Sequence, residues 1–472
     1  MNTPVPQGGY TAERLTQLTG VTGDRIERLH RSGLLQRSSD GAYTADAVDR
    51  LTLVSYASRR GISDSQIEEF CADQGDLLAS LLRTRTPSGA AHTVDEALAQ
   101  LPRELFDDAF LTALLELVGP SQSDPITDED LAALQMTGEA LSTGLPAEAL
   151  LQLIRVMAET LDRVADTESR VFHDYVHERN RADGLTGQQL LAATDAVSAP
   201  LLAMAEPALL YLHRRALHRA MREDFVRHLT EDTRAPVETP GEAPATILFI
   251  DLAGFTPLTL TMGDRAAADV LARFASIVRT TAGRRHGRII KQIGDAFMLT
   301  FDKPEDAVLF GVDVCGQVAT ESHFPPVHIG AHHGSVLYRD GDYVGTTVNL
   351  AARVASATAP GQFLVTDTVA TAIGDRQVRV RGLPPATLKG IDTPTHLFEV
   401  QTPQPGDASR DPVCGMLVQP GAEAATARAW TETYRFCSTD CHRRFVDDPA
   451  RFVERAGAGP QQRGQRQDPH AR

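Results

Sequence analysis

The chain has 472 residues, of which 42% are hydrophobic and 23% are charged. At about 100–200 residues per domain, this length predicts three or four folding units, and the composition allows buried cores, which excludes a wholly disordered chain. The 46 Lys and Arg residues against 62 Asp and Glu residues give a net charge of −16. Such a charge repels phosphates, which excludes a nucleic-acid coat over the whole surface.

Membrane segments and disulfides are not predicted. The chain has no run of about 18 consecutive apolar residues, and its start, MNTPVPQGGY, lacks the basic end and apolar stretch of a signal peptide. We therefore expect a cytoplasmic protein with no membrane contact.

Three of the five cysteines lie within the last sixty residues, namely Cys414, Cys437 and Cys441. In a reducing compartment they are expected as thiols or metal ligands.

The amino-terminal half has the patterns of helices. Helical periodicity from Tyr10 to about Asp76, broken at Thr19-Gly20 and Ser39-Asp40-Gly41, predicts a small separate domain. From Thr127 to about Thr230 the chain is rich in Leu, Ala, Glu and Arg, which predicts a bundle of long amphipathic helices. The three prolines of APVETPGEAP, at 235–244, then predict an extended linker.

The central region alternates between strand and helix patterns. The apolar run Thr246–Ile250 predicts a buried strand that ends at the carboxylate of Asp251. Further strands are expected on both sides of Gly294-Asp295, near Val327–Ala331 and near Ser335–Tyr338, with helices near Arg265–Gly283, near Glu305–Thr320 and from Gly345. This order predicts one sheet covered by helices.

Two carboxylates stand at strand ends. Asp251 follows the first strand, and Asp295 lies in a tight turn between two apolar strands. If those strands are neighbours in the sheet, both carboxylates reach one edge and can hold hard divalent cations, with magnesium as the default. Taken singly, an Asp at a strand end is more often a helix cap or a turn former than a metal ligand.

Three further polar residues suit nucleotide chemistry. Lys291 lies in an otherwise apolar strand, so it needs a partner charge or a base to bind, unless it points to solvent from an edge strand. Asn349 and Arg353 are four residues apart, so on a helix they share one face and can donate jointly to a phosphate. The alternative is an amphipathic helix whose polar pair is only solvated.

These motifs together resemble the class III adenylate and guanylate cyclase family over about Ala245–Gln401. The resemblance rests on FIDLAGFT, KQIGDAFMLTF, HIGAHHGSV, GDYVGTTVNLAARV and LKGI, in that order. It implies two Mg²⁺ or Mn²⁺ ions per site, bound by Asp251 and Asp295, and conversion of ATP to 3′,5′-cyclic AMP and pyrophosphate. It also implies an adenine-selecting pair, Lys291 and Asp342, and a ribose-orienting and transition-state pair, Asn349 and Arg353.

The resemblance also implies where the triphosphate and the second subunit lie. The backbone amides after Asp251 could cradle the triphosphate at a helix start, which makes the cofactor-binding candidates Ala253, Gly254, Phe255 and Thr256. Sites of this family form between two catalytic domains, and the chain has one, so a homodimer with two sites is expected. A Glu/Cys-type pair would suit guanine instead, so guanylate cyclase activity is the alternative.

The amino-terminal region resembles the winged helix-turn-helix of MerR-type regulators over YTAERLTQLTGVTGDRIERLHRSGLL, AYTADAVDRL and RRGISDSQIEEF. Residues 1–80 carry 8 Lys or Arg and 11 Asp or Glu, a net charge of −3, which does not favour DNA binding. DNA contact stays an alternative to a docking or dimerising role.

The subsequent helices resemble regulatory segments that precede actinobacterial cyclase domains. Their histidines are His173, His177, His213 and His218, which either form a pH switch or merely lie at the surface.

The carboxyl-terminal segment DPVCGMLV…YRFCSTDCHRRFVDDPARF resembles the YHS domain. Cys437 and Cys441 share a helical face, and a hairpin can bring Cys414 back to them, which offers three thiolates to a soft or borderline metal. His442 or an outside ligand could complete the site, although His442 adjoins Cys441. Reduced thiols in a small core are the alternative.

The predicted fold class is multidomain: an N-terminal all-α winged helix-turn-helix and helical bundle, a central α+β ferredoxin-like class III cyclase domain, and a small C-terminal α+β cysteine-containing YHS domain. The expected ranges are 1–80 for the helix-turn-helix, 81–125 for a helical connector, 126–234 for the regulatory helices, 235–245 for a linker, 246–402 for the cyclase domain, 403–410 for a second linker, 411–454 for the YHS domain and 455–472 for a disordered tail. From another class of function, an inactive nucleotide-binding sensor with a helix-turn-helix output is the competing hypothesis.

Overall fold

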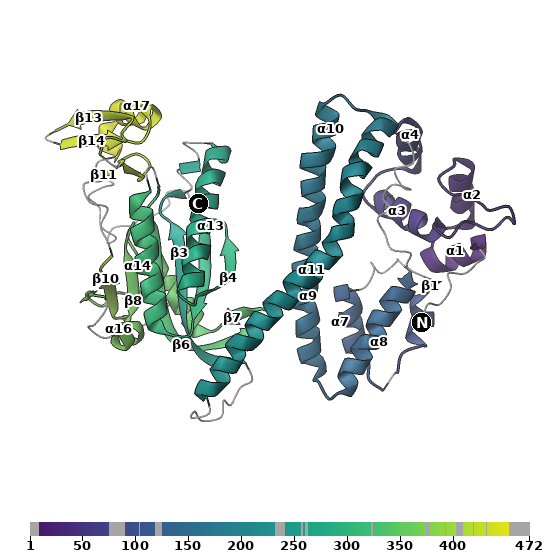
Figure 1. The fold of residues 1–472 in the computed structure, drawn as a ribbon, viewed down its shortest axis with the longest axis horizontal. Helices are drawn as coiled ribbons and strands as arrows, with labels where there is room; N and C mark the ends of the chain where they lie inside the picture. Colours follow the sequence, from purple (N-terminus) through teal and green to yellow (C-terminus); the bar gives the residue numbers. More distant parts are fainter. Residues whose placement is uncertain are drawn as a thin grey trace, which may run out of the picture. The chain divides into compact units, whose positions relative to one another are not determined.

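The computed structural model describes two compact units, residues 1–234 and 235–472 (Figure 1). The described residues are 9–74, 90–102, 104–118, 125–231, 241–255, 258–259, 263–321, 324–373, 378–391, 393–402, 409–418, 420–430 and 432–452. Thr256, linker residues 235–240 and 403–408, and the tail 455–472 lie outside them.

The first unit begins with short helices around their own core. These are α1 (Ala12–Thr19), α2 (Gly23–Arg31), α3 (Ala47–Arg59) and α4 (Asp64–Gln74). The α1 helix starts where the side chain of Thr11 accepts a hydrogen bond from the Arg14 amide, and it ends at Gly20, whose positive φ of 67° closes the predicted turn. Backbone bridges from Tyr43 to Tyr10 and Arg37 complete this small helical structure.

Further helices follow, and the long ones among them lie within the range 127–231, close to where the composition predicts them. They are α6 (Val94–Leu98), α7 (Asp108–Val118), α8 (Asp128–Ser142), α9 (Ala147–Phe172), the π-helical turn η1 (His173–His177), α10 (Glu178–Ala182) and α11 (Gly187–Glu231), with a small ladder between β1 (Ala91–His92) and β2 (Ile126–Thr127). Buried apolar side chains of α7 and α8, with Leu150 of α9, form the core here.

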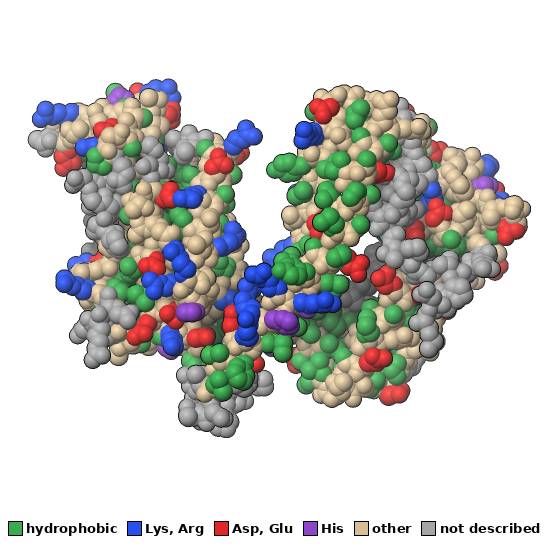
Figure 2. Space-filling view, viewed as in Figure 1, with side chains coloured by type: hydrophobic (Ala, Val, Ile, Leu, Met, Phe, Trp, Pro, Cys, Tyr) green, Lys and Arg blue, Asp and Glu red, His purple; other side chains and the backbone are tan. Residues whose placement is uncertain are grey.

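The α11 helix is unusual because its apolar side chains are mostly exposed. Met204, Tyr211, Met221 and Phe225 are each about 60% exposed, and Figure 2 shows many apolar side chains on the surface of this unit. By length and composition alone, Gly187–Val226 could cross a membrane, which is weak support for a membrane span. The count of consecutive apolar residues missed this helix because charged residues interrupt it.

The second unit is built on an eight-stranded sheet in the order β4-β5-β3-β6-β8-β10-β9, with β7 paired to β6. In chain order its elements are β3 (Glu242–Leu252), α13 (Asp264–Arg284), β4 (Arg288–Ile293), β5 (Ala296–Phe301), α14 (Pro304–Thr320), β6 (Val327–Arg339), β7 (Asp342–Val344), α15 (Thr346–Ser356), β8 (Phe363–Thr366), α16 (Asp367–Ile373), β9 (Val380–Gly382) and β10 (Leu397–Val400). All pairs are antiparallel except β6 with β8.

Helices pack on both faces of this sheet. One core joins α13, α14 and α16 to side chains such as Ile250 and Phe297. On the opposite face, α15 packs through Ala351 against Ile247 and Met298. The sheet covered by helices is therefore confirmed for the described residues.

The two strands predicted near Val327–Ala331 and Ser335–Tyr338 are one strand, β6, so that prediction is wrong. Gly330, which lies inside the first of these predicted strands, marks the close approach of a helix rather than a break in the strand. A Cβ at Gly330 would lie 2.1 Å from the Ala355 amide nitrogen, so only glycine lets α15 approach β6 this closely. The strand stays intact because β3 pairs with it from Glu242↔Leu337 to Leu252↔Val327.

A small cysteine-bearing module ends the described chain. It contains β11 (Ser409–Arg410), β12 (Leu417–Val418), the hairpin β13 (Ala425–Ala429) and β14 (Glu432–Phe436), and α17 (Thr439–Asp447). Its core is aromatic, with Phe436, Phe445 and Phe452 buried. The side chain of Ser438 caps α17 by accepting a hydrogen bond from the Cys441 amide.

Candidate active site

Asp251 and Asp295 lie at the same end of neighbouring strands in the sheet. The β3 strand pairs with β5 up to Ile250↔Phe297, and Asp251 follows at once. Asp295 lies in the turn that joins β4 to β5, where Gly294 takes a φ of 62° that favours glycine. The condition set by the sequence, that the two strands are neighbours, is met, and the charges are close enough for Asp295 to raise the pKa of Asp251.

The two carboxylates are held in an environment that disfavours their charge. Burial, and secondly the charge of Asp295, raise the pKa of Asp251 to about 6. Burial also raises the pKa of Asp295. Among the described residues, the buried Oδ1 of Asp251 has no hydrogen-bond partner. A buried carboxylate oxygen without a donor is costly, and hard oxygen ligands in this arrangement fit a divalent cation.

Lys291 and Asp342 form an ion pair. The Nζ of Lys291 donates to Oδ2 of Asp342, and Oδ1 of Asp342 accepts from the Tyr343 amide at 2.8 Å. Lys291 follows a bulge in β4, where the register with β5 shifts. The β4 strand is at the edge of the sheet, as expected if Lys291 pointed to solvent. The lysine is nevertheless paired with Asp342 rather than free.

Asn349 and Arg353 lie on the exposed face of α15, while Ala351 and Val354 are buried on the other. The shared helical face is as the four-residue spacing predicts. In the described parts of the chain, no hydrogen bond or ion pair joins Asn349 or Arg353 to the Asp251–Asp295 pair or the Lys291–Asp342 pair. Both side chains are therefore available to a ligand or to a second subunit.

The segment after Asp251 is only partly free to bind phosphate. The amide of Ala253 donates to the Pro326 carbonyl at 2.7 Å, so it is not available to a triphosphate in this conformation. Gly254 and Phe255 remain as described candidates for a phosphate cradle, because Thr256 lies outside the described residues. No sequence pattern indicates the Ala253–Pro326 contact, since Pro326 is 73 positions further along the chain.

His328 lies opposite Asp251 in the β3–β6 ladder. Its Nδ1 is 2.9 Å from Oγ1 of Thr358. Burial lowers the pKa of His328. A neutral imidazole here adds no positive charge beside the two carboxylates.

The carboxyl-terminal cysteines come together. The Sγ atoms of Cys414 and Cys437 are 3.4 Å apart, and those of Cys437 and Cys441 are 3.8 Å apart. A fourth group, the carboxylate of the buried Asp411, lies with the thiols within 4.8 Å. Metal ligands are often three residues apart, as Asp411 and Cys414 are. Asp411 was nevertheless not identified from the sequence. His442 instead packs its ring edge-to-face on Phe436, so it does not complete this cluster.

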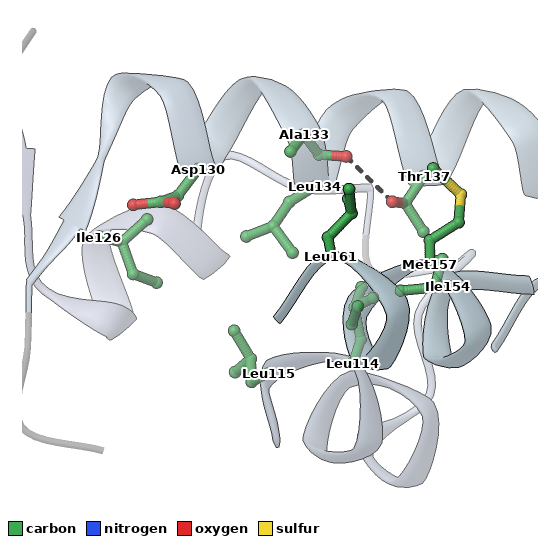
Figure 3. A pocket seen from close by; sticks show the side chains of 11 residues that line it. Leu114, Leu115, Ile126, Asp130, Ala133, Leu134, Thr137, Ile154, Met157 and Leu161 are labelled. Atoms are coloured by element: carbon green, nitrogen blue, oxygen red, sulfur yellow. Dashed lines mark hydrogen bonds between the residues drawn. The ribbon is translucent and has the colours of Figure 1, made fainter. Parts of the chain in front are cut away.

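An apolar pocket of about 280 Å³ lies in the first unit, between α7, α8 and α9 (Figure 3). Its polar groups are already used. Thr137 donates to the Ala133 carbonyl at 2.9 Å, and Asp130 accepts from the Thr127 hydroxyl at 2.7 Å. The pocket therefore lacks the donors and positive charge that a nucleotide phosphate needs.

The basic residues of α2, the helix in the DNA-reading position of the predicted helix-turn-helix, are partly engaged within the protein. The Arg25 guanidinium donates to both oxygens of Asp64, at 2.5 and 2.9 Å, and to Ser58 at 2.6 Å. Arg25 thus ties α2 to α4, which suits a structural role.

Comparison with known proteins identifies the class. The adenylate and guanylate cyclase catalytic domain matches residues 237–400. An uncharacterized protein of Mycobacterium bovis is 31% identical over 322 residues, which cover 67% of this chain and 81% of that protein. The chain belongs to the adenylate and guanylate cyclase family.

More distant relatives carry functional names. A pH-sensitive adenylate cyclase of Mycobacterium tuberculosis is 28% identical over 55% of this chain and 64% of its own length. The crystal structure of the adenylyl cyclase CyaB from P. aeruginosa is 22% identical, with a TM-score of 0.32, over 34% of this chain and 96% of that one. The matched catalytic domain and the cyclase-named sequence relative support a nucleotide cyclase and leave open which nucleotide this chain prefers.

Proposed function

We propose that the protein is an adenylate cyclase that forms 3′,5′-cyclic AMP and pyrophosphate from ATP at sites shared by two copies of the chain. The ion pair between Lys291 and Asp342 carries the choice of ATP. An ammonium can donate to a ring nitrogen of adenine, and a carboxylate can accept from its N6 amine. Guanine presents O6 and N1–H instead, which fit a Glu/Cys-type pair better.

Asp251 and Asp295 are the proposed ligands of two Mg²⁺ or Mn²⁺ ions. Such ions lower the pKa of the 3′-hydroxyl and stabilise the charge on the departing pyrophosphate. The support in this chain is the buried, unpartnered Oδ1 of Asp251 next to a second carboxylate. The role of the protein is to hold the two carboxylates rigidly at the ends of paired strands, so that little reorganisation is needed on binding.

Asn349 and Arg353 are the proposed groups for ribose orientation and transition-state charge. Arg353 keeps its charge at any working pH and can donate two parallel hydrogen bonds to phosphate oxygens. Its place on a regular helix, rather than a loop, fixes the base of the long side chain. A preorganised donor of this kind stabilises negative charge only as it develops, which raises turnover rather than ground-state binding.

A homodimer is proposed because Asn349 and Arg353 are not joined to the other polar groups within one chain. No hydrogen bond or ion pair links them to either of the two pairs within the described residues, and Ile293 and Val344, close in sequence to Asp295 and Asp342, are exposed at 67% and 43%. Exposed apolar side chains beside polar functional residues are typical of an interface. In a symmetric dimer each copy would supply both halves, which gives two equivalent sites.

Turnover on ATP and on GTP tests the proposal directly. The full chain is assayed with each nucleotide and Mg²⁺ or Mn²⁺, and the product is identified by mass. Cyclic AMP formation with a higher kcat/KM for ATP is expected. A preference for GTP would make the protein a guanylate cyclase, and no product with either nucleotide would favour the nucleotide-binding sensor.

Regulation by the flanking parts is a further component of this proposal. The similarity to the M. bovis protein extends over 322 residues, more than the matched cyclase domain contains. Within the first unit, His173 and His177 stack at 5.4 Å in a π-helical turn, and His173 lies 3.7 Å from Glu178. Histidine clusters of this kind are candidates for a pH-responsive element. We expect the pH–activity curve to shift when residues 1–235 are removed.

A further inference from the structure

We propose that Asp411, Cys414, Cys437 and Cys441 bind one thiophilic metal ion, and that this ion braces the segment Ala253–Phe255 of the cyclase domain. The regulatory half of this inference rests on the proposed function of that segment. The binding half rests on the cluster alone, and the two are tested separately below.

The sulfur positions fit a shared ion. Two metal–sulfur bonds of about 2.3 Å at a tetrahedral angle place the sulfurs about 3.8 Å apart. The separations here are 3.4 and 3.8 Å, too long for a disulfide bond of about 2.05 Å, and all three cysteines are free thiols. Three thiolates around one point suit Zn²⁺ or Cu⁺ and do not suit Mg²⁺ or Ca²⁺.

Asp411 is oriented toward the sulfurs by backbone amides. Its Oδ1 accepts from Val413 at 2.8 Å, and its Oδ2 accepts from Cys437 at 2.8 Å. Oδ1 also accepts from the Cys414 amide at 3.4 Å, whereas Oδ2 keeps a second lone pair that can bind an ion. The side chain is 1% exposed, and burial raises its pKa. A buried carboxylate beside three thiols gains a charge partner when a cation binds.

The cluster touches the proposed phosphate cradle. The Cys414 carbonyl oxygen lies 3.6 Å from the Cβ position of Gly254. Leu258 is buried in the same apolar cluster as Cys414 and Cys441, and Phe255 packs on it. The residue that would ligate the ion is thus the residue that contacts the segment after Asp251.

Two more contacts fix the cysteine module to the cyclase domain. The Leu417 amide donates to the Phe324 carbonyl at 3.2 Å, and the Arg410 guanidinium donates to the Pro360 carbonyl at 3.1 Å. Phe324 lies two residues before Pro326, whose carbonyl holds the Ala253 amide. Ligation of Cys414 would therefore limit motion on one side of this segment while these contacts limit motion on the other.

Metal content tests the binding half without any need for activity. The full chain is reduced, freed of metal, loaded with Zn²⁺ or Cu⁺ in excess Mg²⁺, and desalted. One tightly bound ion per chain is expected for one of the two metals. Cys437→Ser and Asp411→Asn should each lose it, and Cys71→Ser, a thiol outside the cluster, should keep it. Failure of both metals to bind at one per chain overturns the site, and retention by Asp411→Asn overturns the four-ligand set.

Hydrogen exchange and kinetics test the bracing half. In the wild-type chain the metal should slow exchange of the Asp251–Phe255 amides, and it should lower the KM for ATP by about fivefold or more, as coupled sites typically do. Cys437→Ser should show neither effect. Unchanged exchange in a metal-loaded chain overturns the bracing. If exchange slows but the chain makes no cyclic AMP, the bracing stands and the proposed function fails.

Discussion

The two polar pairs of the cyclase domain differ in how each is satisfied. Lys291 and Asp342 neutralise one another within a single chain. Asp251 and Asp295 are instead two partly buried acids with raised pKa values, and one oxygen of Asp251 lacks a donor. The comparison teaches that the first pair is satisfied within one chain before any ligand binds, whereas the second would be stabilised by the cations proposed above.

The largest effect is expected where a cation ligand is removed. Asp251→Ala should lower kcat by at least about 10³-fold, because the ions that activate the hydroxyl lose a ligand. Mixed with Asn349→Ala chains, it should recover about a quarter of wild-type activity, because half of the dimers are mixed and each has one intact site. Activity of the mixture no higher than that of either variant would contradict sharing between subunits.

Arg353→Ala should lower kcat by about 10²–10³-fold, the usual loss for one transition-state donor. The exposed position of Arg353 on α15 predicts unchanged thermal unfolding. Arg428→Ala, also an exposed arginine of this unit, is the control and should keep most activity. Near-normal kcat in Arg353→Ala would remove this residue from the active site.

Changing the Lys291–Asp342 pair should alter the preference for ATP over GTP more than the total turnover. The double variant Lys291→Glu with Asp342→Cys should lose at least about tenfold in kcat/KM for ATP relative to GTP, because the new groups match O6 and N1–H of guanine. Comparing the two nucleotides in one preparation controls for partial misfolding. An unchanged ratio would show that the base is read elsewhere.

The smallest effect concerns stability of the metal-free chain. Because the pKa of Asp251 is raised from 3.8 to about 6 on folding, the native state binds more protons than the unfolded state between these values, so this residue makes stability fall as pH rises from about 4 to 6. Asp251→Asn cannot ionise. Its Tm relative to wild type should therefore increase over that pH range and then level off, as thermal unfolding can measure. A constant difference would contradict the raised pKa.

Local sequence patterns predicted the helices and strands well where the spacing of apolar residues and the capping or turn residues agree. The strand that carries Asp251, the helix bearing Asn349 and Arg353, and the helical first unit follow from apolar periodicity and turn residues. The predicted linker 235–245 is wrong at its end, because β3 already begins at Glu242 and pairs there with β6. The prediction failed at β6, where two expected strands form one continuous strand. Gly330 of this strand lets α15 approach it closely, through a contact between residues 25 positions apart that no local pattern reports.

The sequence by itself determined the class of protein and the residue types of its sites, because an ordered set of motifs fixes which side chains are available. Only the tertiary structure decided which of them meet. It paired Lys291 with Asp342, occupied the Ala253 amide with Pro326, and added Asp411 to the three cysteines. The physical reason is that such contacts depend on how strands and loops pack in space, and a buried group is satisfied by whatever lies beside it, however distant in the chain.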